Sequence, residues 1–467
     1  MTQETRVLSG QLPAGCPDFI YLPLEVPPDT REIHVAYVFD HPKVPAGTQG
    51  NGCDIGMFDE RGTDLHSPGF RGWSGGARTE FFIRADEATP GYLPGPLNPG
   101  TWHIILGPYM VAATGLNYTV TATLTTGRAG PSAQPVYPPE RAKGRGRAWY
   151  RGDCHLHSVY SDGKRTPEQI AALARAAKLD FINTSEHNTT SSHAHWSSLA
   201  GDDLLILLGE ELTTRNGHCL AIGTAPGTFA DWRYRARDGA FADAADVIHA
   251  AQGLVVPAHP YATCFACGWK LGYDHADALE VWNGTYTPDD ELALASWDAT
   301  LAASAASSGR WLPAMGNSDA HKDPDVVGLP QTVVLADDLT REAILAGLRS
   351  GHSYLAESSA IRLTLTATSG DTTAGIGERL EVPLDAPVTV RLQVSGAPGC
   401  TPRFVTDEGV PTTGPALPAS GAGTLEWRTT ASYAQYVRAE VRHPPGAAGT
   451  AGAWAAITNP VWLGASS

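Results

Sequence analysis

A predicted β-strand, Trp149 to His155, leads directly into the sequence His155-Leu156-His157-Ser158-Val159-Tyr160-Ser161-Asp162-Gly163. Because side chains alternate along a strand, two histidines two positions apart point to the same face and can chelate one cation. Gly163 suits a turn that swings the carboxylate of Asp162 back toward these histidines. An HxH pair is a weak signal by itself, so the prediction of a metal site depends on the neighbouring strands.

Strands alternate with helical stretches from about Ala148 to Ala356, a pattern that favours parallel β/α units and an α/β fold. The predicted strands are 149–155, 181–186, 204–210, 218–223, 254–258, 278–282, 311–317 and 332–335, and the predicted helices are 167–178, 243–252, 288–307 and 341–349. In β/α barrels the carboxyl ends of the strands meet at one mouth, so residues far apart in the chain become neighbours there.

Nearly every candidate metal ligand lies at the end of one of these predicted strands. The candidates are His155, His157, Asp162, His187, Glu211, His218, His259, Asp319 and His321. Imidazole combined with carboxylate suits Zn²⁺, Mn²⁺ or Fe²⁺ better than Ca²⁺ or Mg²⁺, which prefer oxygen ligands. We therefore predict a multinuclear site of two or three divalent cations, Zn²⁺ or Mn²⁺ with Fe²⁺ as the alternative.

In this order, the motifs resemble those of the PHP (polymerase and histidinol phosphatase) superfamily of metallohydrolases. The resemblance implies a distorted (β/α)7 barrel. It also implies three metal positions: one held by His155, His157, Glu211 and Asp319, a second by Glu211, His218 and His259, and a third by Asp162, His187 and His321. Glu211 would bridge the first two, with Glu210 as the competing bridge, and Asp162 replaces a residue that is often His in the family.

Both ends of the chain have a different pattern. Residues 1–146 alternate short Val, Ile, Tyr and Phe runs with turn residues, which is typical of a β-sandwich, and end in a Pro-rich, basic linker. The barrel is predicted over 147–357, and residues 358–467 return to alternation, which predicts a small C-terminal β domain.

This layout resembles the CehA/McbA-type metallohydrolases, which include carbaryl hydrolases. The segments that carry the resemblance are 69–76, Gly-Phe-Arg-Gly-Trp-Ser-Gly-Gly, together with 95–103 and 457–460.

The predicted chemistry is hydrolysis of an ester bond. Two cations that share a carboxylate lower the pKa of a bridging water toward about 7, so hydroxide is available as the nucleophile at neutral pH. The candidate catalytic residues are Glu211, Asp319 and Asp162, of which Asp319 or Asp162 could move the proton.

The expected substrate is a small, uncharged aryl carbamate or carboxyl ester. A phosphoesterase usually adds Arg or Lys to clamp the phosphoryl oxygens, and few such residues lie near the predicted mouth, beside many aromatics. The candidate substrate contacts are Asn188, Tyr160, Phe265, Trp282 and Asn283. The alternative is a PHP-type phosphoesterase or phosphodiesterase, and a remoter one is a non-catalytic binding protein with a structural metal barrel.

Composition argues against several other partners. The formal net charge of −16 works against nucleic acid or an anionic membrane, and no apolar run reaches the length of a membrane span. Seven cysteines fit reduced thiols better than a disulfide framework, so the pair Cys264-x-x-Cys267 is expected to be an ordinary loop. A cytoplasmic location is the default expectation, and the sequence is compatible with a homo-oligomer.

Overall fold

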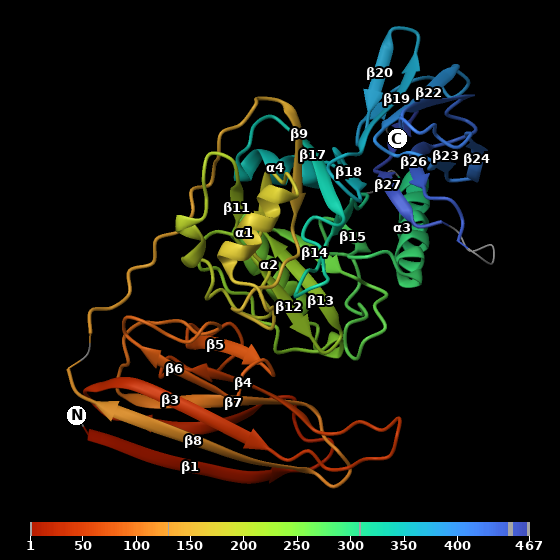
Figure 1. Ribbon diagram of the computed structural model, residues 1–467. Coiled ribbons are helices and arrows are strands. Elements are labelled where there is room, and N and C mark those ends of the chain that lie inside the picture. The colour runs from red at the N-terminus through yellow and green to blue at the C-terminus, as the bar shows by residue number, and fades with distance from the viewer. Residues whose placement is uncertain (1, 129, 308–309, 447–451, 465–467) are drawn as a thin grey trace.

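The computed structural model describes residues 2–128, 130–307, 310–446 and 452–464, with strands at both ends of the chain and most helices in the middle (Figure 1). Two four-stranded sheets, β1-β8-β3-β6 and β2-β7-β4-β5, make up the N-terminal part. Their strands are β1 (Thr2–Leu12), β2 (Ile20–Val26), β3 (Thr30–Phe39), β4 (Gly52–Phe58), β5 (Phe70–Gly75), β6 (Glu80–Arg84), β7 (Gly100–Met110) and β8 (Leu116–Thr126). Alternate side chains such as Ile33, Val35 and Tyr37 fill the core between the sheets, as a sandwich requires.

The middle part holds short strands in several pairings. They are β9 (Ala148–Asp153), β10 (Phe181–Asn183), β11 (Leu205–Leu207), β12 (Glu210–Thr214), β13 (Gly217–Ile222), β14 (Leu254–Ala258), β15 (Leu279–Asn283), β16 (Ala314–Asn317) and β17 (Gln331–Ala336). β9, β10 and β11 pair in parallel, as do β15 and β16. These pairs agree with the predicted β/α units.

The strands of the middle part do not close into one hydrogen-bonded barrel among the described residues. β12, β13 and β14 form a separate antiparallel sheet, and β17 pairs antiparallel with β9. Only Arg215 and Asn216 separate β12 from β13, which is too short for the crossover that parallel strands need. A single parallel bridge from His187 to Glu211 links β12 to the segment that follows β10.

Helices cover this part of the molecule. They are α1 (Pro167–Ala176), α2 (Phe241–Ala250), α3 (Pro288–Ser307) and α4 (Arg341–Arg349). Two of the predicted ranges agree with α3 and α4, and the other two differ at their ends. α1 begins at a capping box, in which Thr166 and Gln169 bond each other's backbone N–H groups. No helix within the described ranges is both long enough and apolar enough to cross a membrane.

The C-terminal part shares a sheet with the middle part across the predicted boundary at 357. β17 pairs with β18 (Ser353–Ala356), which pairs with β27 (Trp454–Thr458), and the sheet continues through β26 (Tyr436–Arg442), β23 (Thr401–Thr406) and β24 (Gly409–Thr413). Two short strands, β21 (Arg379–Leu380) and β28 (Val461–Leu463), pair at its side. The boundary is therefore a continuous hydrogen-bonded sheet and not a flexible joint.

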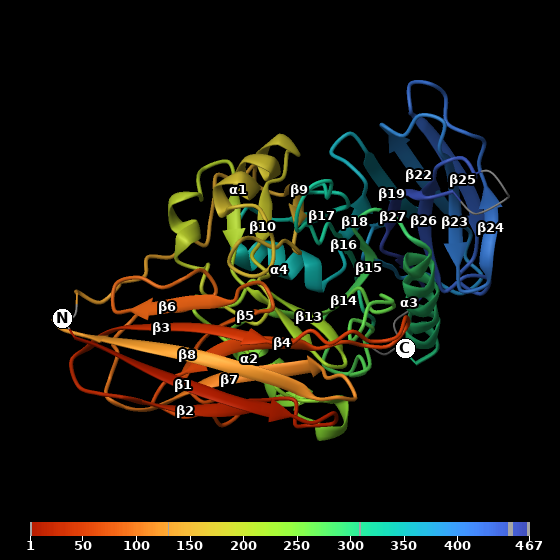
Figure 2. The ribbon, with the colours of Figure 1, turned by 60° about the horizontal axis from the view of Figure 1, so that its bottom comes forward.

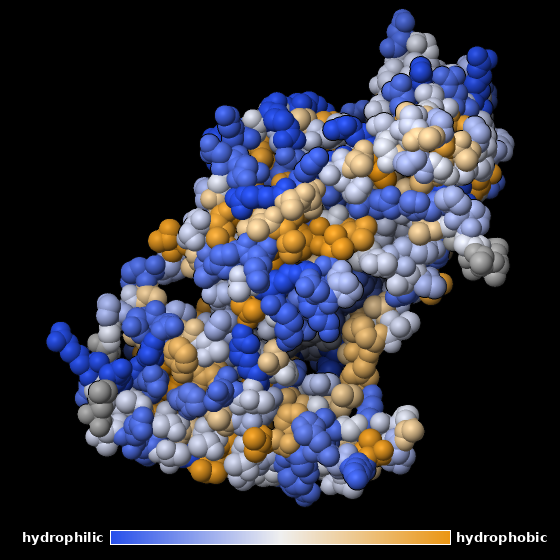
Figure 3. Space-filling model, viewed as in Figure 1, coloured by the Kyte–Doolittle hydropathy of each residue, from blue (hydrophilic) through white to orange (hydrophobic). Residues whose placement is uncertain are grey.

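A second sheet packs against this continuous one, and the apolar core of the C-terminal part lies between them. The second sheet contains β20 (Thr372–Gly375), β19 (Arg362–Ser369), β22 (Val388–Ser395) and β25 (Gly423–Thr429). Helix α3 lies beside β26 (Figure 2), where the guanidinium of Arg438 forms two hydrogen bonds with Asp298. The N-terminal sandwich lies against the middle part, and the surface between them is hollowed (Figure 3).

Candidate metal centre

The first two candidate ligands follow β9 and do not lie on it. The strand ends at Asp153, whose buried carboxylate accepts hydrogen bonds from the backbone N–H groups of His155, Ser318 and Gly328. A parallel bridge between Leu156 and Ala320 keeps the chain extended beyond this point. His155 and His157 therefore still share a face, with ring centroids 5.1 Å apart.

The carboxylate of Glu211, on β12, lies at the centre of the cluster. It is within 3.4 Å of a ring nitrogen from each of five histidines: His155, His157, His187, His218 and His259. Glu211 is fully buried, and its register opposite Leu220 is set by the β12–β13 pairing. On the competing neighbour, Glu210, the carboxylate turns away and accepts a hydrogen bond from the backbone N–H of Ala230.

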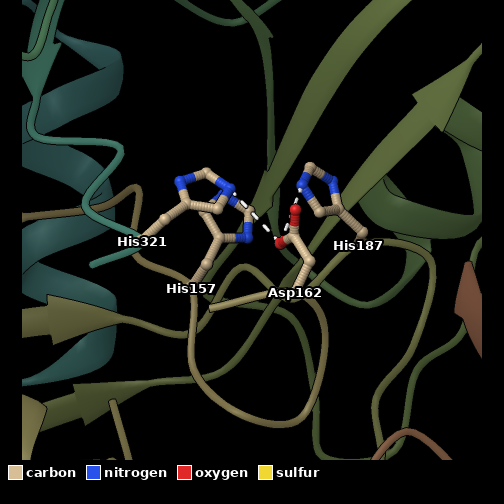
Figure 4. Close-up of side chains that lie close together, drawn as sticks. All are labelled: His157, Asp162, His187 and His321. Atoms are coloured by element: carbon tan, nitrogen blue, oxygen red, sulfur yellow. Dashed lines mark ion pairs between the residues drawn. The ribbon is translucent and has the colours of Figure 1, made fainter. Parts of the chain in front are cut away.

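The remaining candidates complete the cluster. Oδ1 of Asp319 lies 3.2 Å from Nε2 of His155 and 3.0 Å from Nε2 of His157. Figure 4 shows Asp162 between His187 and His321, with Oδ1 at 3.5 and 3.3 Å from their Nε2 atoms. All of the predicted ligands thus lie close together, although they come from segments that span residues 155–321.

Donor atoms from these residues form four overlapping groups, and within each group the atoms all lie within 4.8 Å of one another. The groups are His157 with Asp162, His187 and His321; His155 with His259 and Asp319; His155 with His157 and Glu211; and His187 with Glu211 and His218. These groups differ from the sets implied by the family resemblance. His157 lies with Asp162, His187 and His321, and Asp319 lies with His259. Several of these atoms are buried without a hydrogen bond, among them Nε2 of His155, Oε2 of Glu211 and Oδ1 of Asp319. Since buried polar atoms are normally satisfied, the arrangement fits divalent cations.

The charges of the cluster depend on one another. Burial by itself would lower the pKa of His187, but the nearby carboxylates, Glu211 first, raise it to about 9. In the same way burial would raise the pKa of Glu211, but the surrounding imidazoles, His155 first, hold it well below its usual range. A cation that binds here must displace protons from the imidazoles, so its affinity will depend on pH.

Glu280, on β15, contacts the cluster from behind and was not identified from the sequence. Its buried carboxylate accepts hydrogen bonds from Nδ1 of His155 (3.0 Å) and Nδ2 of Asn317 (2.9 Å) through one oxygen. The other oxygen bonds the backbone N–H of His259 (2.8 Å) and Nδ2 of Asn283 (2.9 Å). This carboxylate directs Nε2 of His155 toward the cluster, a role that carboxylates often have behind metal-ligating histidines. The available signal was an acidic residue inside the apolar strand Leu279-Glu280-Val281-Trp282.

A second buried carboxylate, Glu186, holds the loop that carries Asp162. It accepts hydrogen bonds from the hydroxyl and backbone N–H of Ser158 and from the hydroxyl of Ser161. These bonds fix the loop just before Asp162, so the chain itself positions the carboxylate of Asp162.

Two cavities open beside the cluster. The first, about 330 Å³, is lined from the sandwich and the middle part together and includes Asp162, His187 and His218. The second, about 300 Å³, includes His259, Glu280 and Asp319. The cluster therefore lies between an aromatic cavity and a more polar one.

The predicted substrate contacts divide between these cavities and other places. Asn188 and Phe265 line the first cavity, and Asn283 lines the second. Tyr160 lines a separate cavity toward the linker. Trp282, predicted to contact substrate, lines neither of these two cavities. A β-bulge after Glu280 shifts the register of β15, and the indole is buried in the core against Trp454.

The expectation for the cysteine pair is also corrected. Cys264 and Cys267 form a disulfide in the loop that carries Phe265, and Cys267 lines the first cavity. The chain turns tightly between them, bringing their Cα atoms to 5.4 Å, within the range of disulfides. The other cysteines are free thiols.

No protein-family model and no curated protein matches the chain. Among solved structures it is similar to a two-domain protein from Bacteroides vulgatus that contains a predicted PHP-like metal-dependent phosphoesterase, with 15% sequence identity and a TM-score of 0.36, covering 70% of this chain and 100% of that one. It is also similar to an amidohydrolase from Chromobacterium violaceum, with 17% identity and a TM-score of 0.27, covering 38% of this chain and 89% of that one. Similarities of this size establish neither a family nor an activity for the chain.

Proposed function

We propose that the chain is a PHP-type, divalent-metal-dependent hydrolase that acts on aryl carbamates or carboxyl esters. The observation that carries the proposal is the buried carboxylate of Glu211 among five imidazoles, with Asp319 beside it and a cavity of substrate size adjoining. Such a set of nitrogen and oxygen donors suits Zn²⁺ or Mn²⁺.

The side chains of the cluster have distinct roles in this proposal. The candidate ligands would hold the cations, which when bound supply Lewis acidity and lower the pKa of a bound water. Glu280 keeps His155 oriented through its Nδ1. Asp319 accepts a hydrogen bond from Nδ2 of Asn283 at Oδ2, and its carboxylate is the first group that can take a proton from an attacking water. Asp162, which lines the first cavity, is the second group that can accept this proton.

The cavity walls favour an ester or carbamate over a phosphate ester. Among the described residues that line the two cavities, Arg215 is the one Arg or Lys side chain. Its guanidinium already donates hydrogen bonds to the backbone carbonyls of Pro108 and Tyr109. Phosphoryl oxygens would therefore lack the cationic side chains that usually hold them.

The test uses purified protein, loaded with Zn²⁺ or Mn²⁺, on 1-naphthyl N-methylcarbamate, 1-naphthyl acetate and bis(p-nitrophenyl) phosphate. We expect turnover of the carbamate or the acetate, and a loss of at least about 100-fold in kcat/KM for Glu211→Gln, since the shared carboxylate is removed. Exposed Glu342→Gln, at the start of α4, is the matched control. Turnover of the phosphate ester alone would contradict the proposal.

A further inference from the structure

We infer that the carboxylate of Asp54, in the N-terminal sandwich, binds a positively charged nitrogen of the substrate. The inference rests on the proposed function, because it names the substrate class of the same site: an ester or carbamate that carries an alkylammonium group. It refines the expectation of an uncharged substrate.

The strand β4 directs Asp54 out of the sandwich core. Cys53, Ile55 and Met57 point into that core, so Asp54 lies on the opposite face, as does Phe58. This face packs against the middle part through Phe58, which belongs to the same apolar cluster as Leu212 of β12. Asp54 is thus an acidic residue on an apolar face, where it lines the first cavity together with Asp162, His187 and His218.

Within the described parts of the chain, no hydrogen bond or close ion pair reaches the carboxylate of Asp54, and the positive charges that act on it, Arg215 and His187, do so through space. The other sandwich carboxylate that lines the cavity, Asp18, is bonded to the guanidinium of Arg235. Arg215, in the turn between β12 and β13, also lines the cavity, and its guanidinium is bonded to the backbone carbonyls of Pro108 and Tyr109. Burial raises the pKa of Asp54 to about 7, although Arg215 and His187 act to lower it.

Aromatic rings form much of the remaining wall. Those that line the cavity are Phe19, Trp73, Tyr109, Trp232 and Phe265. The faces of such rings attract cations, most strongly when the cation is shielded from water. A carboxylate combined with several aromatic rings is the chemistry that recognises alkylammonium groups, whereas an anionic group would meet an unpaired carboxylate.

Two glycines leave space above the carboxylate. A Cβ on Gly76 would lie 3.4 Å from Oδ1 of Asp54, and a Cβ on Gly75 would lie 3.6 Å from Nε1 of Trp73. A side chain at either position would fill the room that a ligand needs between the carboxylate and the indole. The site is therefore open where an ammonium group would contact Asp54.

Isothermal titration calorimetry on the full chain, with choline and its uncharged isostere 3,3-dimethylbutan-1-ol, tests the inference without turnover. We expect choline to bind at least about tenfold more tightly than the alcohol, because only choline gains the carboxylate and the cation–π contacts. Asp54→Asn should bring the two affinities within about threefold of each other. Gly76→Val, which keeps the charge and fills the space, should weaken choline binding as well. Asp371→Asn, in the exposed turn after β19, is the control and should keep the wild-type preference.

The ratio of the two affinities tests the ammonium site independently of whether the protein hydrolyses esters. Equal affinities in the wild type, no detectable choline binding, or a preference that survives Asp54→Asn would each overturn the inference, even if 1-naphthyl acetate is hydrolysed. A preference that Asp54→Asn removes supports the ammonium site, even if no ester is turned over and the proposed function fails. If hydrolysis is found, benzoylcholine should exceed 3,3-dimethylbutyl benzoate at least about tenfold in kcat/KM, and Asp54→Asn should remove that ratio.

Discussion

Individual carboxylates lie both among the candidate metal ligands and behind them, where they hold the ligands in place. Glu211 faces the imidazoles directly, whereas Glu280 lies behind them and accepts hydrogen bonds from His155, Asn283, Asn317 and the backbone of His259. An imidazole presents one nitrogen to a metal and the other to its support. The support therefore determines which nitrogen carries the proton and where the ring points.

Replacing Glu280 by Gln should lower metal affinity without removing a ligand. The amide has one acceptor oxygen, so either His155 and Asn317, or the backbone N–H of His259 and Asn283, lose their acceptor. We expect about a 10- to 100-fold loss of affinity. Competition with a chelating dye measures this change. Exposed Glu408→Gln, in the β23–β24 turn, is the matched control. Unchanged affinity in Glu280→Gln would show that Glu280 does not position His155.

Charged side chains connect helix α3 to strand β26. Arg438 bonds Asp298 of the helix, and Arg442 bonds Glu291, about two helical turns earlier. Between these arginines lies Glu440, 1% exposed, whose carboxylate also contacts Arg403. Burial alone would raise the pKa of Glu440, but these guanidinium groups, Arg438 first, lower it to about 2.

This pKa predicts how the stability of the α3–β26 contact depends on pH. Because the folded pKa lies below the ordinary value of 4.5, ionised Glu440 stabilises the fold above about pH 4.5, and the contribution is lost as pH falls toward about 2. Glu440→Gln should therefore destabilise the protein on the order of 3 kcal/mol at pH 7, and the difference should shrink by about 2 kcal/mol at pH 3. Urea unfolding of both proteins at the two pH values measures it. A difference that stays constant with pH would contradict the assignment.

The whole molecule surrounds the centre with three structural parts. The candidate ligands follow or occupy strands of separate sheets in the middle part, the sandwich supplies one wall of the first cavity, and the C-terminal strands extend the sheet that contains β9. Cations bound at the cluster would tie these separate sheets together and offset part of the negative charge, which is −16 over the chain. Metal binding should therefore be coupled to global stability.

Removal of metal should lower the melting temperature of the whole chain. A ligand that binds only the folded state stabilises it in proportion to the logarithm of its concentration over Kd, so we expect a chelator to lower Tm by at least about 3 °C and added Zn²⁺ or Mn²⁺ to restore it. Differential scanning calorimetry measures the change, and Glu211→Gln should respond less than wild type. Equal Tm values with and without chelator would argue against a cation that joins these sheets.

Local patterns in the sequence were enough to predict the ranges of helices such as 288–307 and 341–349, because periodicity and capping act over a few residues. They also picked out the residues that gather around Glu211. Packing between distant segments decided the rest: the support of His155 by Glu280, the burial of Trp282, the Cys264–Cys267 disulfide and the exposure of Asp54 to the cavity. The physical reason is that a strand's alternation defines two faces, but only the neighbouring sheets decide whether a face meets core, solvent or a cavity.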